Sequence, residues 1–131
     1  VYLDALTAYD DVGTAINPMM VEGQVHGGIV QSLGQAFMEE AVFDKDGHFA
    51  NPSYMDYAMP RADDVPNFKW DFYTGAPCQT NPLGAKGVGE LGTVGATPAI
   101  VNAVLDALRD NGVSHIDMPL SPQKVWAALQ N

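Results

Sequence analysis

The sequence predicts a single α+β domain, in which mixed strands pack with two long helices and one short C-terminal helix. Two stretches place apolar residues at helical spacing, and residues 68–73 alternate apolar and polar side chains. Strands and helices do not alternate regularly along the chain, which argues against a parallel α/β fold. With 131 residues and 47% hydrophobic side chains, residues 1–131 are long enough for one domain with a core.

The first third of the chain predicts a strand followed by a long helix. Residues 1–9 alternate loosely and are expected to form the strand, which acidic turn residues follow. Asn17 has the properties of an N-cap and Pro18 those of a first helical residue. Apolar residues at helical spacing then extend the helix over residues 18–40. They are Val25, Ile29, Leu33 and Phe37.

This helix contains an unusual number of glycines, at positions 23, 27, 28 and 34. Each interior glycine costs about 1 kcal/mol relative to alanine. We therefore expect another helix or a ligand to approach the helix backbone closely.

The middle of the chain predicts a hairpin, a loop and a strand. Short apolar runs at 41–43 and 48–50 flank a turn at 44–47. Residues 56–67 contain two prolines and predict an extended loop. Residues 68–73 predict a half-buried strand because their alternation is strict.

The last third predicts a long loop and two helices. Residues 75–96 are rich in glycine and proline and predict an irregular, functional loop. Thr97 is expected to cap the second long helix, Pro98 to open it, and residues 111–112 to end it. Ser121 is expected to cap the short third helix.

Charge and cysteine content exclude several classes of function. Six basic residues against 16 acidic ones give a net charge of -10, which disfavours nucleic acids and anionic membranes as partners. No uninterrupted apolar run approaches the ~20 residues that span a bilayer. A single cysteine, Cys78, excludes an internal disulfide and a thiolate zinc site. These features predict a cytoplasmic protein, with the periplasm as the alternative.

One acid stands alone in the glycine-rich loop. Residues 87–92 fit G-x-G-x-x-G, and Asp106 lies where a ribose-binding acid would be expected. We reject a dinucleotide site because no parallel-sheet strand precedes the motif. Glu90 is instead a candidate general base, and its plain alternative is a solvated loop glutamate.

Other polar residues predict no separate site. Gln24 and His26 lie on the glycine-rich helix and could be a buried, hydrogen-bonded amide and an ordinary, partly buried histidine. His26, His48 and His115 share no metal-ligand spacing, so no metal ligand is predicted. The turn at 44–47 lacks the later acids of a calcium loop.

Four segments together carry a family resemblance: residues 17–28, 54–63, 81–90 and 117–126. They resemble the C-terminal end of the molybdenum-binding subunit of the xanthine oxidase family. That family includes aldehyde oxidoreductases, aerobic carbon monoxide dehydrogenases and bacterial heterocycle hydroxylases. The resemblance covers nearly the whole chain, in order and with the expected spacing.

The resemblance implies an oxidoreductase that hydroxylates a carbon centre with water as the oxygen source. Glu90 would be the general base, Gln24 would lie beside the molybdenum, and Gly89 would pass its backbone close to the metal. The implied cofactor is a molybdenum-pyranopterin, in its molybdopterin cytosine dinucleotide form. Electrons would leave through Fe-S clusters to FAD on partner subunits or domains.

The resemblance also implies dependence on other polypeptide. The family's large subunit is several times longer, so this chain would be its C-terminal domain and would need the remainder of that subunit. We expect no cofactor and no activity in the chain alone. The alternative is a non-catalytic paralogue or assembly module that keeps the fold without the cofactor. Carbon monoxide, aldehydes and N-heterocycles all remain open as the small-molecule substrate.

Overall fold

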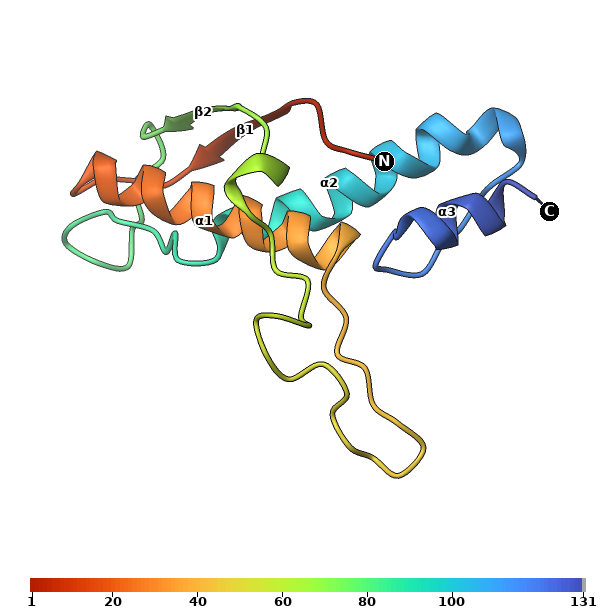
Figure 1. Cartoon of the computed structure of the whole chain (residues 1–131). Coiled ribbons are helices and arrows are strands. Elements are labelled where there is room, and N and C mark those ends of the chain that lie inside the picture. Colours follow the sequence, from red (N-terminus) through yellow and green to blue (C-terminus); the bar gives the residue numbers. More distant parts are fainter. Residues whose placement is uncertain (131) are drawn as a thin grey trace.

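The computed structural model, which describes residues 1–130, contains two long helices side by side beneath a two-stranded sheet (Figure 1). The mixture of strands, two long helices and a short C-terminal helix confirms the α+β prediction. The elements in chain order are β1 (Leu6–Asp11), α1 (Pro18–Phe37), β2 (Phe68–Tyr73), α2 (Leu91–Leu108) and α3 (Pro122–Ala128), with 3-10 turns at Ala62–Asp64 and Arg109–Asn111.

The two strands are parallel, and α1 lies in the connection between them. Leu6 aligns with Phe68, and Asp11 aligns with Tyr73. In both strands half-buried and exposed residues alternate. The half-buried face packs on a core cluster from both helices, formed by Val25, Ile29 and Ala96. The prediction of a half-buried strand at residues 68–73 is therefore confirmed.

The first strand begins and ends later than residues 1–9, because its acids belong to the sheet rather than to a turn. Trp70 Nε1 donates a hydrogen bond to Asp10 Oδ2 across the sheet at 2.9 Å. Asp11 Oδ2 pairs with Lys86 Nζ at 2.6 Å. These contacts hold both carboxylates in extended backbone, so the chain turns only at Gly13.

Helix α1 begins as predicted but ends earlier than residue 40. Asn17 Oδ1 accepts the Met20 amide at 3.2 Å, which confirms the N-cap. At the other end the amides of Met38 and Glu39 both donate to the Gly34 carbonyl, at 2.9 and 2.8 Å. This turn ends the helix after Phe37.

Helix α2 begins at Leu91, so the prediction that Thr97 caps it and Pro98 opens it is wrong. The Glu90 carbonyl accepts the amides of Thr93 and Val94 and starts the helix seven residues earlier. Pro98 lies inside α2, where its missing N–H leaves the Val94 carbonyl without a helical partner on an exposed face.

The two long helices meet through small residues, which we call the helix seam: Gly28 and Ser32 on α1, and Gly92, Thr93 and Thr97 on α2. A Cβ on Gly28 would lie 2.9 Å from the Thr93 amide nitrogen. Thr93 Oγ1 donates to the Gly28 carbonyl at 3.2 Å. The sequence predicted a close approach to α1, and at Gly28 the neighbour is a helix.

Ser32, which is completely buried, completes the seam. Its hydroxyl donates to the Thr93 carbonyl at 3.2 Å and accepts from Thr97 Oγ1 at 3.0 Å. The Thr97 hydroxyl therefore joins two helices instead of capping one.

The C-terminal end matches the sequence prediction. Gly112 adopts a left-handed conformation after the 3-10 turn that follows α2. Ser121 Oγ accepts the Lys124 amide at 3.3 Å and caps α3. A second core cluster joins α3 to α2. It consists of Val104, Ile116, Leu120 and Val125.

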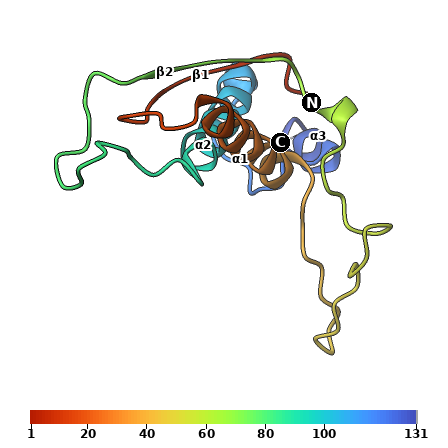
Figure 2. The ribbon, with the colours of Figure 1, turned by 90° about the vertical axis from the view of Figure 1, so that its left-hand side faces the viewer.

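Residues 39–60 form an arm that projects from the helices (Figure 1 and Figure 2). The predicted hairpin is reduced there to one antiparallel bridge between Phe43 and Phe49, whose rings stack at 5.2 Å between centroids. The segment expected as an extended loop contains the 3-10 turn Ala62–Asp64, which Asp64 stabilises by accepting the Arg61 amide.

Residues Leu91–Asn111 form a helix that is long and apolar enough to cross a membrane, by length and composition. Asn102 and Asp106 interrupt its apolar residues, so the segment qualifies by its average hydropathy rather than as the uninterrupted apolar run that the sequence analysis looked for. Only 22% of this apolar stretch is buried within the chain. Much of the apolar surface of α2 is thus left uncovered by residues 1–130.

Candidate functional site

The glycine-rich loop is fastened to the end of β1. The Gly84 carbonyl accepts the amides of Thr14 and Cys78, both at 2.9 Å, and the Lys86 amide donates to the Val12 carbonyl at 3.1 Å. Gly13 has a φ of 61°, and a Cβ there would collide with the Gly84 carbonyl. Only glycine fits this crossing, so the loop that leads to Glu90 starts from a fixed point.

A charged pair reinforces the same crossing. The Lys86 ammonium hydrogen-bonds Asp11, and the Gly13 amide donates to Asp11 Oδ1 at 3.0 Å. The hydrogen bond from Lys86, and then that from Gly13, hold the pKa of the Asp11 carboxyl below its ordinary value. Lys86 lies four residues before Glu90, so the pair ties the loop's approach to the sheet.

Glu90 lies immediately before the first residue of α2 and is exposed. Its side chain makes no capping hydrogen bond, and nothing among residues 1–130 pairs with its carboxylate. Within this chain Glu90 therefore matches the alternative interpretation of a solvated loop glutamate, and the chain supplies no cover for it. Any enclosure of Glu90 must therefore come from outside the chain.

Gln24 lies in the second turn of α1 and is also exposed, with no side-chain partner in the described part of the chain. The next residue, Val25, presents its carbonyl to Gly92, where a Cβ would collide with it. Gly92 in turn lies two residues after Glu90. Gln24 and Glu90 therefore flank the same contact between α1 and α2.

Four glycines near these two side chains have open space around them. A Cβ on any of them would meet nothing within 4 Å. They are Gly23 and Gly27 on α1, and Gly87 and Gly89 in the loop. Together with Gln24 and Glu90 they form what we call the open surface. A bulky group could approach the backbone here, so the residues present fit a large cofactor.

His26 does not join this surface as a ligand. Its half-buried ring lies 5.6 Å from the Phe68 ring and 6.4 Å from the Trp70 ring, centroid to centroid. This packing against β2 confirms the interpretation of a partly buried histidine.

The motif at 87–92 is not a dinucleotide fingerprint. β2 ends at Tyr73, well before the motif, and the last glycine of the motif packs against α1. Asp106 pairs with Arg109 on the same helix. The premise of the rejection, that no strand directly precedes the motif, is therefore confirmed.

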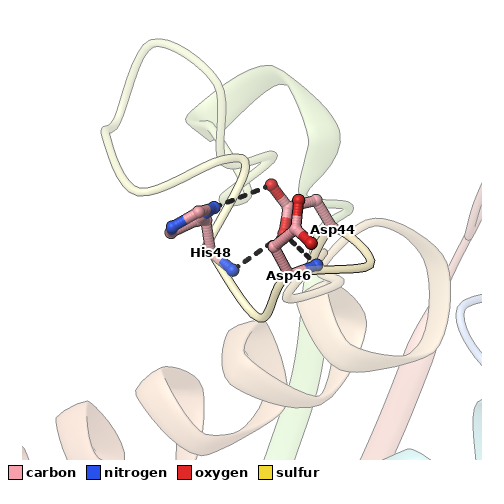
Figure 3. Close-up of side chains that lie close together, drawn as sticks. All are labelled: Asp44, Asp46 and His48. Atoms are coloured by element: carbon pink, nitrogen blue, oxygen red, sulfur yellow. Dashed lines mark hydrogen bonds and ion pairs between the residues drawn. The ribbon is translucent and has the colours of Figure 1, made fainter.

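Three side chains at the tip of the arm lie close together: Asp44, Asp46 and His48 (Figure 3). Their ligand atoms lie within 4.8 Å of one another, and all three residues are exposed. Asp44 accepts the amides of Asp46 and His48 at 2.8 and 2.9 Å, and its other oxygen meets His48 Nδ1 at 3.0 Å. The hydrogen bonds from His48 lower the pKa of Asp44. The cluster is accounted for as the turn predicted at 44–47.

The sequence analysis missed Ser32 and Thr93, which position the start of α2 against α1. The signal was available. Small residues recur every four positions at Gly28 and Ser32, and again at Gly92 and Ala96. Such spacing places small side chains on one helix face and allows two helix backbones to approach closely.

Comparison with known proteins connects this arrangement to a family. Residues 1–66 match the family model described as a molybdopterin cofactor-binding domain. The carbon monoxide dehydrogenase large chain of Hydrogenophaga pseudoflava is 42% identical over 94% of this chain and 15% of its own length.

Solved structures agree in fold as well as in sequence. Quinoline 2-oxidoreductase from Pseudomonas putida 86 has a TM-score of 0.90 at 38% identity, over 95% of this chain and 16% of that one. The Cu,Mo-CO dehydrogenase in its carbon monoxide reduced state has a TM-score of 0.88 at 40% identity, over 95% of this chain and 16% of that one. The chain thus spans about a sixth of the proteins that it matches. It belongs to the molybdopterin cofactor-binding domain family.

Proposed function

We propose that this chain is the C-terminal domain of a molybdenum hydroxylase and contributes its general base, Glu90. One observation carries the proposal. Glu90 and Gln24 flank the contact of the two long helices, and both side chains are exposed without a partner in the chain. In a molybdopterin cofactor-binding domain, an open, glycine-lined surface with one free carboxylate is suited to face a cofactor.

The reaction class fits a free carboxylate. Oxidation of a carbon with water forms a C–O bond and releases two protons and two electrons. An aldehyde or an N-heterocycle loses a C–H bond in this step, whereas carbon monoxide has none and both protons then come from water. The molybdenum-pyranopterin, when bound, supplies the two-electron redox chemistry. Glu90 accepts a proton from the water-derived oxygen on one of its carboxylate oxygens, which requires that no internal cation or amide occupies them.

Gln24 has a positioning role in this proposal. Its amide offers both a donor and an acceptor, and it projects from a helix that the seam fixes. Such a side chain orients oxygen atoms near the reacting centre without itself exchanging protons. Gly89 leaves the backbone beside Glu90 uncovered, so the same group can approach both residues.

The proposal extends to partners. The relatives are described as large chains and large subunits, which supports an assembly with further subunits. We infer that the remainder of the subunit grips the cofactor in its cytosine dinucleotide form, and that Fe-S clusters and FAD on partners take the two electrons. An aldehyde, an N-heterocycle or carbon monoxide would serve as the substrate.

The test is Glu90→Gln in the complete enzyme. Glutamine keeps the shape but cannot accept the proton. Single-turnover reduction of molybdenum by whichever of the three substrates the wild type oxidises should slow at least ~100-fold. Molybdenum content should stay normal, and Glu40→Gln, which removes an exposed carboxylate that lies three residues after the end of α1 and pairs with Lys124, should react normally. A fully loaded Glu90→Gln enzyme that is reduced at the wild-type rate would refute the proposal.

A further inference from the structure

Strand β1 has an outer edge that nothing in the described chain covers. The Val12 amide donates to the Tyr73 carbonyl at 3.3 Å, so the backbone N–H of Val12 points toward β2. In a parallel pair, the backbone N–H and C=O groups of every second residue point toward the same neighbouring strand, so those of Ala8 and Asp10 also point toward β2. The amides and carbonyls of Thr7 and Tyr9 point the other way, and within residues 1–130 no backbone group pairs with them.

A groove of about 230 Å³ runs along this edge. β1 forms one wall, Ile29 contributes to the lining, and small residues of α2 form the other wall. The α2 residues are Leu91, Gly92, Gly95, Ala96 and Ala99. Gly95 and Ala99 are exposed, and a Cβ on Gly95 would meet nothing within 4 Å. The small side chains leave room for those of an incoming strand.

The outer edge of β2 is partly open as well, because within residues 1–130 no further backbone group pairs with Trp70, but its Phe72 amide differs. There the Phe72 amide is already satisfied by Asp71 Oδ1 at 2.8 Å. Exposed strand edges recruit further strands, and parallel sheets are normally wider and covered on both faces. The uncovered edge with an adjoining groove is therefore that of β1.

We propose that an extended segment from the remainder of the molybdopterin subunit adds to β1 as a further strand and seats its side chains over Gly95 and Ala99. This rests on the proposed function only in that the chain is part of a longer subunit. The matched large chain is covered to 15%, so most of such a subunit lies outside this structure. The apolar stretch that begins at Leu91 is only 22% buried, which leaves surface for the segment to cover.

Residue-resolved hydrogen exchange tests the proposal. The Thr7 and Tyr9 amides should exchange at least about tenfold more slowly in the complete subunit than in the 131-residue chain. The Ala8 and Asp10 amides should be protected in both. The cofactor-free subunit should behave like the loaded one, so the result is independent of whether Glu90 is the base.

Gly95→Arg adds a matched variant. The arginine should fill the groove without touching the chain's own packing, so the 131-residue chain should keep its helical circular dichroism. In the complete subunit the added protection of Thr7 and Tyr9 should be lost, whereas Ala107→Arg, at an exposed position outside the groove, should preserve it.

Two results would overturn the proposal. Equal exchange of Thr7 and Tyr9 in the isolated chain and the complete subunit would show that no strand is added, whether or not the variant folds. Protection that grows with the concentration of the isolated chain, together with dimer formation in sedimentation, would assign the edge to a second copy instead.

Discussion

Glycines in the helix seam and glycines on the open surface look alike in the sequence but have different causes in the structure. At Gly28 and Gly92 a side chain would collide with the backbone of the facing helix. At Gly23 and Gly27, on the same helix as Gly28, a side chain would meet nothing. The seam glycines are therefore explained by the fold of this chain, and the open glycines are not.

The two groups of glycines are expected to serve different purposes, the seam glycines stability and the open-surface glycines function. A glycine in open space within a helix costs about 1 kcal/mol and returns no packing inside the chain. Its presence at two positions beside Gln24 indicates a neighbour outside the chain. Substitutions in the seam should therefore act on unfolding, and substitutions on the open surface should act on cofactor loading and turnover.

The largest expected effect is on turnover, at Gln24. In the complete enzyme Gln24→Ala should raise the barrier by ~3 kcal/mol, because one preorganised hydrogen-bonding group is lost. The unfolding free energy of the 131-residue chain should not change, since Gln24 has no partner in the described chain. Steady-state kinetics at measured molybdenum loading and urea unfolding check both halves. An unchanged kcat at full loading would remove the positioning role.

Gly92→Ala should give the opposite pattern. The added methyl group would collide with the Val25 carbonyl and lie 3.0 Å from the Ile29 amide nitrogen, and neither backbone group can move cheaply. We expect a loss of about 2 kcal/mol in the unfolding free energy, as for other overpacked sites. Gly95→Ala in the same helix has open space and should gain stability. Equal changes in unfolding free energy for Gly92→Ala and Gly95→Ala would contradict the close helix contact at Gly92.

A smaller effect is expected at Gly27. In the isolated chain Gly27→Ala should raise the unfolding free energy by about 1 kcal/mol, through helix propensity alone. In the complete subunit it should lower molybdenum content, because the methyl group occupies space that the cofactor would use. Gly28→Ala, one residue away, should instead destabilise the chain. A stabilised Gly27→Ala subunit with full molybdenum would show that the open surface does not hold the cofactor.

Local patterns in the sequence predicted those parts of the fold that local chemistry determines. Asn17 caps α1 and residues 68–73 form a half-buried strand, because a cap and an alternation each involve only a few neighbouring residues. The start of α2 was mispredicted. Thr97 and Pro98 have the properties of a helix start, yet the Thr97 hydroxyl bonds Ser32, which lies 65 positions earlier in the chain.

The choice of Glu90 and Gln24 as site residues stays a prediction. The structure adds that both are exposed and that each lies within two residues of the contact between Val25 and Gly92. For Glu90 the sequence analysis had left a solvated loop glutamate open, and in this chain the residue is exposed. Whether further polypeptide covers either side chain could not be predicted, because most of the matched subunit lies outside this chain. The parallel pairing of β1 with β2 was missed for a related reason, since the two strands are joined by more than fifty residues.

The smallest expected effect concerns the charged pair that ties the glycine-rich loop to β1. The hydrogen bonds from Lys86 and Gly13 hold the pKa of Asp11 below its ordinary value of 3.8. The ionised carboxylate therefore stabilises the fold above about pH 4, and this contribution is lost as pH falls through the lowered pKa. Wild type should be more stable than Asp11→Asn at neutral pH, and the difference should shrink toward pH ~3. Both side chains are partly exposed, so added salt should reduce it as well.

Urea unfolding of both chains across this pH range, at low and high salt, measures the difference directly. Asp110→Asn, an exposed acid outside the crossing, serves as the control and should show no comparable pH-dependent gap. Asp11→Asn should also increase hydrogen exchange at the Lys86 amide, because the ion pair with Asp11 holds Lys86 where its amide bonds the Val12 carbonyl. This crossing lies four residues before Glu90. A stability gap that stays constant down to pH ~3 would mean that the Asp11 charge does not fasten the loop, and that the glycine crossing alone holds Glu90 in place.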